Sequence, residues 1–328
     1  MSRRIWIAAA AGTVMLVGAG GYAIGPGAPW LVDQLADGQR VWRLGRIHID
    51  GVSGAWLGYL RAAHVTIGDE HGVWLEANNI TLRWRPQDFP FGSVRIDGAR
   101  AEQIEILRRP SLTPARPPGP TRLDVHLTDL QVEALRFDEP VFGVPARFSA
   151  MLDLDVEERR IISADARLER TDSDADRFAG FYKEGDNFAL NVDLFGEAGG
   201  VFARALGVPD QSVSAHAASD GTGSAGEATL TAAIGSSPLV EGEVRWTPSG
   251  WQAQGGGRLE LLPSLRTLGR RIGTTFEITA SGAHVGAFEA RATTPLLVAD
   301  LTGVRDGARR LEGPARFTIT TDRLSAIA

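Results

Sequence analysis

The chain has 328 residues, of which 43% are hydrophobic and 23% charged, with a formal net charge of −6 and no cysteine. This length allows one large or two medium domains, and the mean hydropathy of −0.07 excludes a protein with many membrane spans. The acidic balance argues against nucleic acid as a partner. The lack of cysteine excludes thiolate catalysis, iron–sulfur clusters and cysteine-ligated zinc.

The first predicted element is the apolar segment from Ile5 to Ile24, which follows Arg3 and Arg4 and contains no charge. As a helix it would extend about 30 Å, the thickness of a bilayer's hydrocarbon core. We expect residues 1–30 to form a signal-anchor helix in the inner membrane, with the bulk of the chain in the periplasm. A cleaved signal peptide is the alternative, and it would also export the chain. The anchor residues are Ile5, Trp6, Ile7, Val14, Met15, Leu16, Val17, Tyr22 and Ile24.

From Val41 to Ile319, apolar and polar residues alternate along short segments that are separated by turn signals such as Asp97-Gly98. This period of two predicts about 16 to 18 strands, each with one wet and one dry face, paired antiparallel as a long meander. The residues singled out on the dry face are Ile80, Leu82, Trp84, Val94, Ile96, Leu123, Val125, Leu127, Phe148, Leu152, Leu154, Val156, Leu190, Val192 and Leu194.

Four segments interrupt the alternation. Residues 111–120 are rich in proline and predict an extended loop, and residues 171–186 are acidic and predict a loop or short helix. Leucines at helical spacing between Leu259 and Ile272 predict a short amphipathic helix, and Val201–Leu206 predicts another helical turn.

A search for catalytic, metal and cofactor motifs gives only weak matches. Residues 172–183 begin like a calcium-binding loop, but Arg177 and Lys183 occupy the positions where glycine and glutamate are needed. The segment Gly221–Gly226 matches the dinucleotide-binding pattern by letters, without the strand and helix that this fingerprint requires. The six histidines show no metal-ligand spacing. We therefore expect a protein that is not an enzyme and has no metal or cofactor.

The dry face of the predicted sheet must be covered by something. Three coverings would remove this face from water: a second layer of sheet, a lipid chain, or an apolar segment of a client protein. The alternation is the same in all three cases, so the residues alone leave the choice open.

Several segments, in this order along the chain, resemble the amino-terminal part of the TamB family, which is related to the AsmA-like and other bridge-type lipid transfer proteins. They are Gly45–Val52 (GRIHIDGV), Gly54–Gly58 (GAWLG), Gly72–Ala77 (GVWLEA), Leu82–Trp84 (LRW), Ile104–Pro110 (IEILRRP) and Val201–Pro209 (VFARALGVP). The similarity extends over essentially the whole chain and is strongest between residues 41 and 110.

The resemblance implies that residues 41–328 form an elongated periplasmic domain, a long antiparallel sheet curled into a U-shaped groove that the dry-face residues line. It implies that the groove conducts phospholipid between the inner and outer membranes and supports outer-membrane biogenesis. Assembly of outer-membrane proteins and autotransporters by strand-edge pairing is the alternative. The family's partner is TamA, an outer-membrane barrel of the BamA type. Family members are several times longer and end in a further β domain, so docking to the barrel would need a partner segment.

Overall fold

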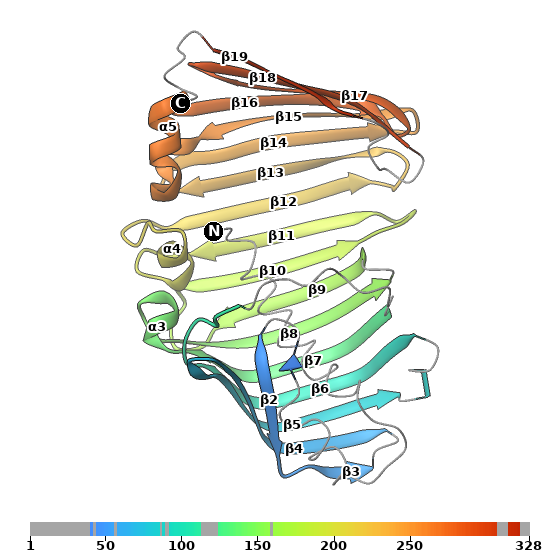
Figure 1. The fold of residues 1–328 in the computed structure, drawn as a ribbon, viewed down its shortest axis with the longest axis vertical. Coiled ribbons are helices and arrows are strands. Elements are labelled where there is room, and N and C mark those ends of the chain that lie inside the picture. The colour runs from blue at the N-terminus through green and yellow to red at the C-terminus, as the bar shows by residue number, and fades with distance from the viewer. Residues whose placement is uncertain are drawn as a thin grey trace. The chain divides into compact units, whose positions relative to one another are not determined.

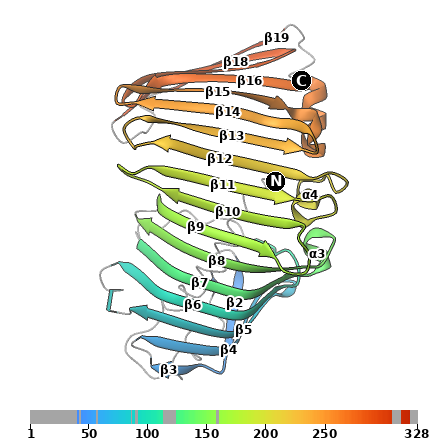
Figure 2. The same cartoon turned by 180° about the vertical axis from the view of Figure 1, so that it is seen from behind.

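The computed structural model describes residues 40–41, 44–55, 58–85, 87–88, 92–112, 124–157, 160–306 and 314–321. The predicted anchor residues, Leu123 and most of the proline-rich segment lie outside the described residues. The chain divides into two compact units, unit 1 ending at Asp174 and unit 2 beginning at Ala175, and each is described by itself. In both units strands dominate and helices are few and short, which confirms the predicted mainly β class (Figures 1 and 2).

The strands and the helix of unit 1 are β1 (Arg40–Val41), β2 (Gly45–Asp50), β3 (Ser53–Ala55), β4 (Tyr59–Asp69), β5 (Gly72–Arg85), β6 (Ser93–Ile106), β7 (Asp124–Phe137), α3 (Glu139–Phe142), β8 (Ala146–Glu157) and β9 (Arg160–Arg170). Those of unit 2 are β10 (Asp176–Lys183), β11 (Ala189–Gly196), α4 (Val201–Ala205), β12 (Val213–Gly221), β13 (Gly226–Ile234), β14 (Ser237–Thr247), β15 (Gly250–Arg258), η3 (Leu259–Leu261), η4 (Pro263–Leu265), α5 (Arg266–Ile272), β16 (Thr275–Ala283), β17 (Gly286–Thr294), β18 (Leu297–Arg305) and β19 (Arg316–Thr321).

One strand pair in unit 1 departs from the predicted antiparallel meander. β6 and β7 are parallel, with Val94 opposite Val125 and Ile104 opposite Leu135. The reason is the long connection from residue 107 to residue 123, which contains the proline-rich segment. It is long enough to carry the chain back to the end of the sheet where β6 began, as a parallel pair requires. The other described pairs of unit 1 are antiparallel.

The sheet of unit 1 is strongly bent at its amino-terminal side. Asn79 in β5 and Asp129 in β7 have positive φ angles of 51° and 54°, and the register of β7 with β8 shifts next to Asp129. Irregularities of this kind bend a strand and increase its twist. In Figure 1, β2 runs across the direction of the strands that follow it. Leu44 and Ile47 thereby join a core cluster with Val132 of β7.

Unit 2 is a regular antiparallel ladder in which β10 to β19 pair in chain order. The prediction of a loop or short helix over residues 171–186 was wrong for Asp176–Lys183, which form strand β10. Phe178 and Tyr182 alternate there with Arg177 and Lys183, a period-two pattern that the acidic residues just before the strand obscured.

The short helices of unit 2 fall where they were predicted. α4 covers Val201–Ala205, and Leu259–Ile272 forms the turns η3 and η4 followed by α5. Pro263 is the first residue of η4. At this position the missing N–H of proline costs no helical hydrogen bond. In Figure 1, α4 and α5 lie at the same ends of the strands of unit 2, and Figure 2 shows the same from behind.

Candidate functional site

In unit 1 the predicted groove residues are core residues. Ile80 belongs to a first cluster with Trp74, Ile104 and Val132. A second cluster contains six of the predicted residues, namely Leu82, Trp84, Val94, Ile96, Leu127 and Leu154, with Leu152 and Val156 half-buried against it. Phe148 is fully buried and meets Phe137 edge to face at 5.8 Å, and Val125 is half-buried. These side chains are buried against one another, as in an ordinary hydrophobic core.

The covering of this face comes from unit 1 itself. Leu44 and Ile47 lie in the first cluster, and Ile49 packs against both clusters. Val141 of α3 is fully buried in the first cluster. The curled edge of the sheet and the short helix therefore supply, within unit 1, the apolar layer that a dry sheet face requires.

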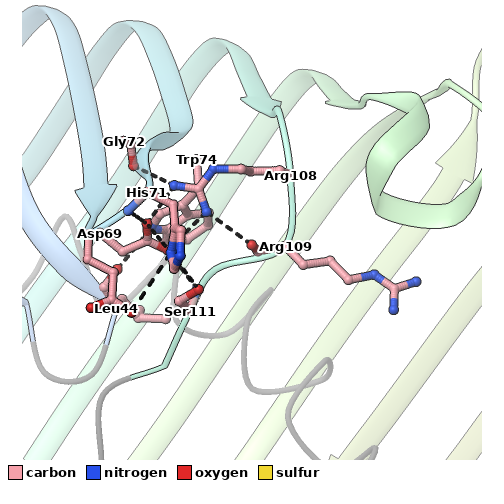
Figure 3. A network of polar contacts seen from close by, with 9 residues as sticks. Leu44, Asp69, His71, Gly72, Trp74, Arg108, Arg109 and Ser111 are labelled. Atoms are coloured by element: carbon pink, nitrogen blue, oxygen red, sulfur yellow. Dashed lines mark hydrogen bonds and ion pairs between the residues drawn. The ribbon is translucent and has the colours of Figure 1, made fainter.

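A polar network holds this covering in place (Figure 3). The Asp69 carboxylate, whose side chain is 3% exposed, accepts hydrogen bonds from both terminal nitrogens of Arg108 at 2.6 and 3.0 Å and from the backbone N–H of Ser111 at 2.6 Å. Arg108 also donates to the carbonyl oxygen of Gly72 at 2.6 Å. The Arg108 guanidinium keeps the pKa of Asp69 well below its usual range.

Two further contacts extend the network to the covering elements. The indole N–H of Trp74 donates to the carbonyl oxygen of Leu44 at 2.8 Å, which fixes the residue just before β2. Nε of Arg109 donates to the carbonyl oxygen of Val141 at 2.7 Å, which fixes α3. The β4–β5 turn, the start of the crossover, β2 and α3 are thus connected by buried or half-buried polar bonds.

We expect Asp69→Asn to lower the free energy of unfolding of unit 1 by about 1–3 kcal/mol at pH 7, because a charge-assisted pair is lost. Because the pKa of Asp69 is lower in the folded chain than in the unfolded chain, its contribution is complete above the ordinary pKa of about 3.8 and is lost as the pH falls below it. Urea unfolding followed by hydrogen exchange of β4 and β5 measures this. Glu70→Gln, on the exposed neighbouring side chain, is the control. A gap between wild type and Asp69→Asn that stays constant down to pH 3 would contradict the assignment.

The strand register of unit 2 builds a second apolar face, which we call the apolar face of unit 2. One row of residues crosses all ten strands without a polar side chain: Gly180, Val192, Ala217, Leu230, Gly242, Gly255, Ile278, Ala292, Ala299 and Ile319. Leu190 and Leu194 flank Val192 on the same face. Of the described strand residues, only Asp176 and Arg305 bring a formal charge to this face.

The opposite face of unit 2 is polar and contains ion pairs between neighbouring strands. Arg291 contacts Asp300 at 2.7 Å, and His216 contacts Asp193 at 2.7 Å. The difference between the two faces is the difference expected for a sheet with one wet and one dry side. Here, however, the described residues cover only part of the dry side.

Exposure shows that the apolar face of unit 2 is open. Leu230 is 44% exposed and Ile278 is 43% exposed, whereas every member of the two core clusters of unit 1 is below 10%. Val192, Leu190 and Leu194 are half-buried. Contiguous, partly exposed apolar surfaces are typical of binding surfaces.

Both ends of the strands limit the open area. At the helical end, a third core cluster contains Ala203 of α4, Val208, Val213 and Ile234. Asp176 lies beneath α4 and accepts the backbone N–H groups of Val201 and Phe202 at 2.8 and 3.1 Å, which explains a buried carboxylate on this face. At the other end, the rings of Tyr182, Phe188 and Trp246 stack edge to face. The open area lies between these two borders.

Sequence reasoning located only three residues of this surface, Leu190, Val192 and Leu194. It missed the rest because most positions from β12 to β18 carry alanine or glycine, which alternate with polar residues but score weakly as hydrophobic. The long run of Ala and Gly at every second position was the signal that could have found them.

Metal-ligating residue types are scattered among the described residues. No group of three or more His, Asp or Glu side chains is arranged to hold a metal ion there. In the same part of the chain, no helix is long and apolar enough to cross a bilayer, and the predicted anchor lies outside it. His126 and His64 contact Asp155 and Asn78 on neighbouring strands, so the described histidines do not converge on one site.

No protein-family model, curated protein or solved structure matches the chain.

Proposed function

We propose that this protein binds phospholipid along the apolar face of unit 2 and moves it between the inner and outer membranes of a bacterial envelope. The observation that carries the proposal is the uncharged, half-exposed row that crosses all ten strands of unit 2. Acyl chains are the ligand whose chemistry matches such a surface, because they have no polar group to satisfy.

The expected binding energy lets an acyl chain bind to this face without being held at one position. Removing an acyl chain of about 16 methylenes from water is worth on the order of 10 kcal/mol at about 0.8 kcal/mol for each methylene. Much of the row is glycine and alanine, so the apolar face of unit 2 has few side chains that could form deep pockets. The gain is then similar at neighbouring positions, and a chain can slide from strand to strand.

The sequence supports the proposed location. The predicted signal anchor, with its apolar segment at residues 5–24, would hold the chain in the inner membrane with its bulk in the periplasm. The chain's resemblance to the TamB family makes an outer-membrane barrel such as TamA the corresponding partner, provided that a partner segment docks to it. In this proposal unit 1, which has a packed core, does not bind lipid, and unit 2 carries the lipid.

Assembly of outer-membrane proteins by strand pairing is the second candidate. Among the described strands β19 pairs with β18 alone, and its Phe317 and Ile319 are exposed. A free strand edge of this kind can accept a client strand.

Transfer of labelled phospholipid between vesicles tests the proposal. The full chain, reconstituted into donor vesicles, is expected to accelerate movement of the label to acceptor vesicles. No acceleration, together with capture of a client strand at β19, would favour the assembly scaffold instead.

A further inference from the structure

Arg305 occupies an unusual position at the border of the apolar face of unit 2. It lies opposite Gly286 at the end of β18 and shares the face with Phe288. Its guanidinium carbon is 4.9 Å from the ring centroid of Phe288 and 5.4 Å from that of Trp251. A cation at these distances is attracted to the faces of both rings.

Glycines on the intervening strands make this arrangement possible. Gly282 lies between Trp251 and Phe288 in the register of β15, β16 and β17. A Cβ atom at Gly282 would fall 2.6 Å from Cβ and 2.9 Å from Cα of Phe288, so a larger residue there would displace Phe288. Gly303 lies on the other side of Phe288. The sequence thus builds a two-ring platform beneath one arginine.

Two hydrogen-bond donors of this platform have no acceptor among the residues that the structure describes. Among the described residues no carboxylate pairs with the Arg305 guanidinium, whereas Arg291 on the polar face pairs with Asp300 at 2.7 Å. The indole N–H of Trp251 is buried and has no partner either. Both groups therefore have hydrogen-bonding capacity that no described residue uses.

Arg305, which has no carboxylate partner among the described residues, lies at the border of an open apolar surface. This combination matches a ligand with one anionic end and one apolar end.

We infer that Arg305 binds the phosphate of a phospholipid headgroup whose acyl chain lies on the apolar face of unit 2. The inference rests on the proposed function and adds to it the group that is recognised and the end of the strands at which the headgroup lies. The planar guanidinium can donate two parallel hydrogen bonds to phosphate oxygens, a geometry that an ammonium group does not provide.

The test compares two amphiphiles that differ in the phosphate. Decanoyl lysophosphatidylglycerol and decanoylglycerol are titrated by calorimetry into the full chain held in amphipol. Wild type is expected to bind the phosphate-bearing amphiphile about tenfold more tightly. Arg305→Gln is expected to remove this preference and to leave decanoylglycerol binding unchanged. Arg258→Gln, an exposed arginine on the polar face, is expected to keep it.

Each outcome has a distinct meaning. Equal binding of both amphiphiles by wild type would overturn the role of Arg305 and leave the proposed function standing, whereas binding of neither would contradict the proposed function itself. Inorganic phosphate that binds as tightly as the lysolipid would identify a free-phosphate site and overturn the headgroup assignment. If circular dichroism shows that Arg305→Gln does not fold, Arg305→Lys decides: a reduced but measurable preference supports the inference, and an unchanged preference contradicts it.

Discussion

Leu230→Arg is expected to reduce phospholipid transfer at least tenfold while unit 2 stays folded. Leu230 lies in β13 at the middle of the apolar row and is 44% exposed, so a guanidinium there keeps its contact with water and costs little stability. An acyl chain that crosses this position would strip water from the charge. That penalty is several kcal/mol, and each 1.4 kcal/mol is about a tenfold change in binding.

The matched control for this change is Thr231→Arg. Thr231 is the next residue of the same strand, is exposed on the polar face and lies opposite Glu241. The added charge is the same, but it does not lie in the path of the lipid. Vesicle-to-vesicle transfer and circular dichroism are measured for both variants. Normal transfer by a folded Leu230→Arg variant would contradict a lipid path along this face.

Phe148→Ala is expected to lower the free energy of unfolding of unit 1 by about 3–5 kcal/mol. Phe148 is 0% exposed and contacts the ring of Phe137, so the substitution leaves a cavity in a packed core. A loss of this size is a large part of the stability of an ordinary domain, about 5–15 kcal/mol. Urea unfolding followed by hydrogen exchange of the β7 and β8 amides measures it.

The same experiment distinguishes a packed core in unit 1 from an open, lipid-filled groove. Met151→Ala, on the same strand but 50% exposed, is the control and is expected to change stability by less than about 0.5 kcal/mol. If Phe148 lined an open, lipid-filled groove, its truncation would cost little in the lipid-free chain. A loss below about 1 kcal/mol for Phe148→Ala would therefore indicate an open interior in unit 1.

Much of the strand structure could be predicted from alternation, because one dry face imposes a period of two on each strand. Ala146, Phe148, Ala150, Leu152, Leu154 and Val156 share one face of β8 as that period requires. The direction of β7 relative to β6 could not be predicted, because it depends on a connection whose path is not encoded in the alternation.

What covers each dry face could not be predicted either. In unit 1 it depends on the bends at Asn79 and Asp129 and on bonds such as Trp74 to Leu44, which join residues far apart in the chain. In unit 2 six of the ten residues of the row that crosses the open face are alanine or glycine, whose small side chains give a weak hydrophobic signal. The same alternation therefore leads to a closed core in one unit and to an open surface in the other.

A photo-crosslinking scan tests the lipid path most directly. Benzoylphenylalanine is introduced at one position at a time in the full chain expressed in bacterial cells, and crosslinked products are identified by mass spectrometry. The positions on the apolar face are Val192, Ala217, Leu230 and Ile278, and their neighbours on the polar face are Asp193, His216, Thr229 and Glu277. We expect phospholipid adducts at the first four positions and none at the other four. Adducts on both faces alike, or on neither, would contradict the proposal that lipid moves along this surface.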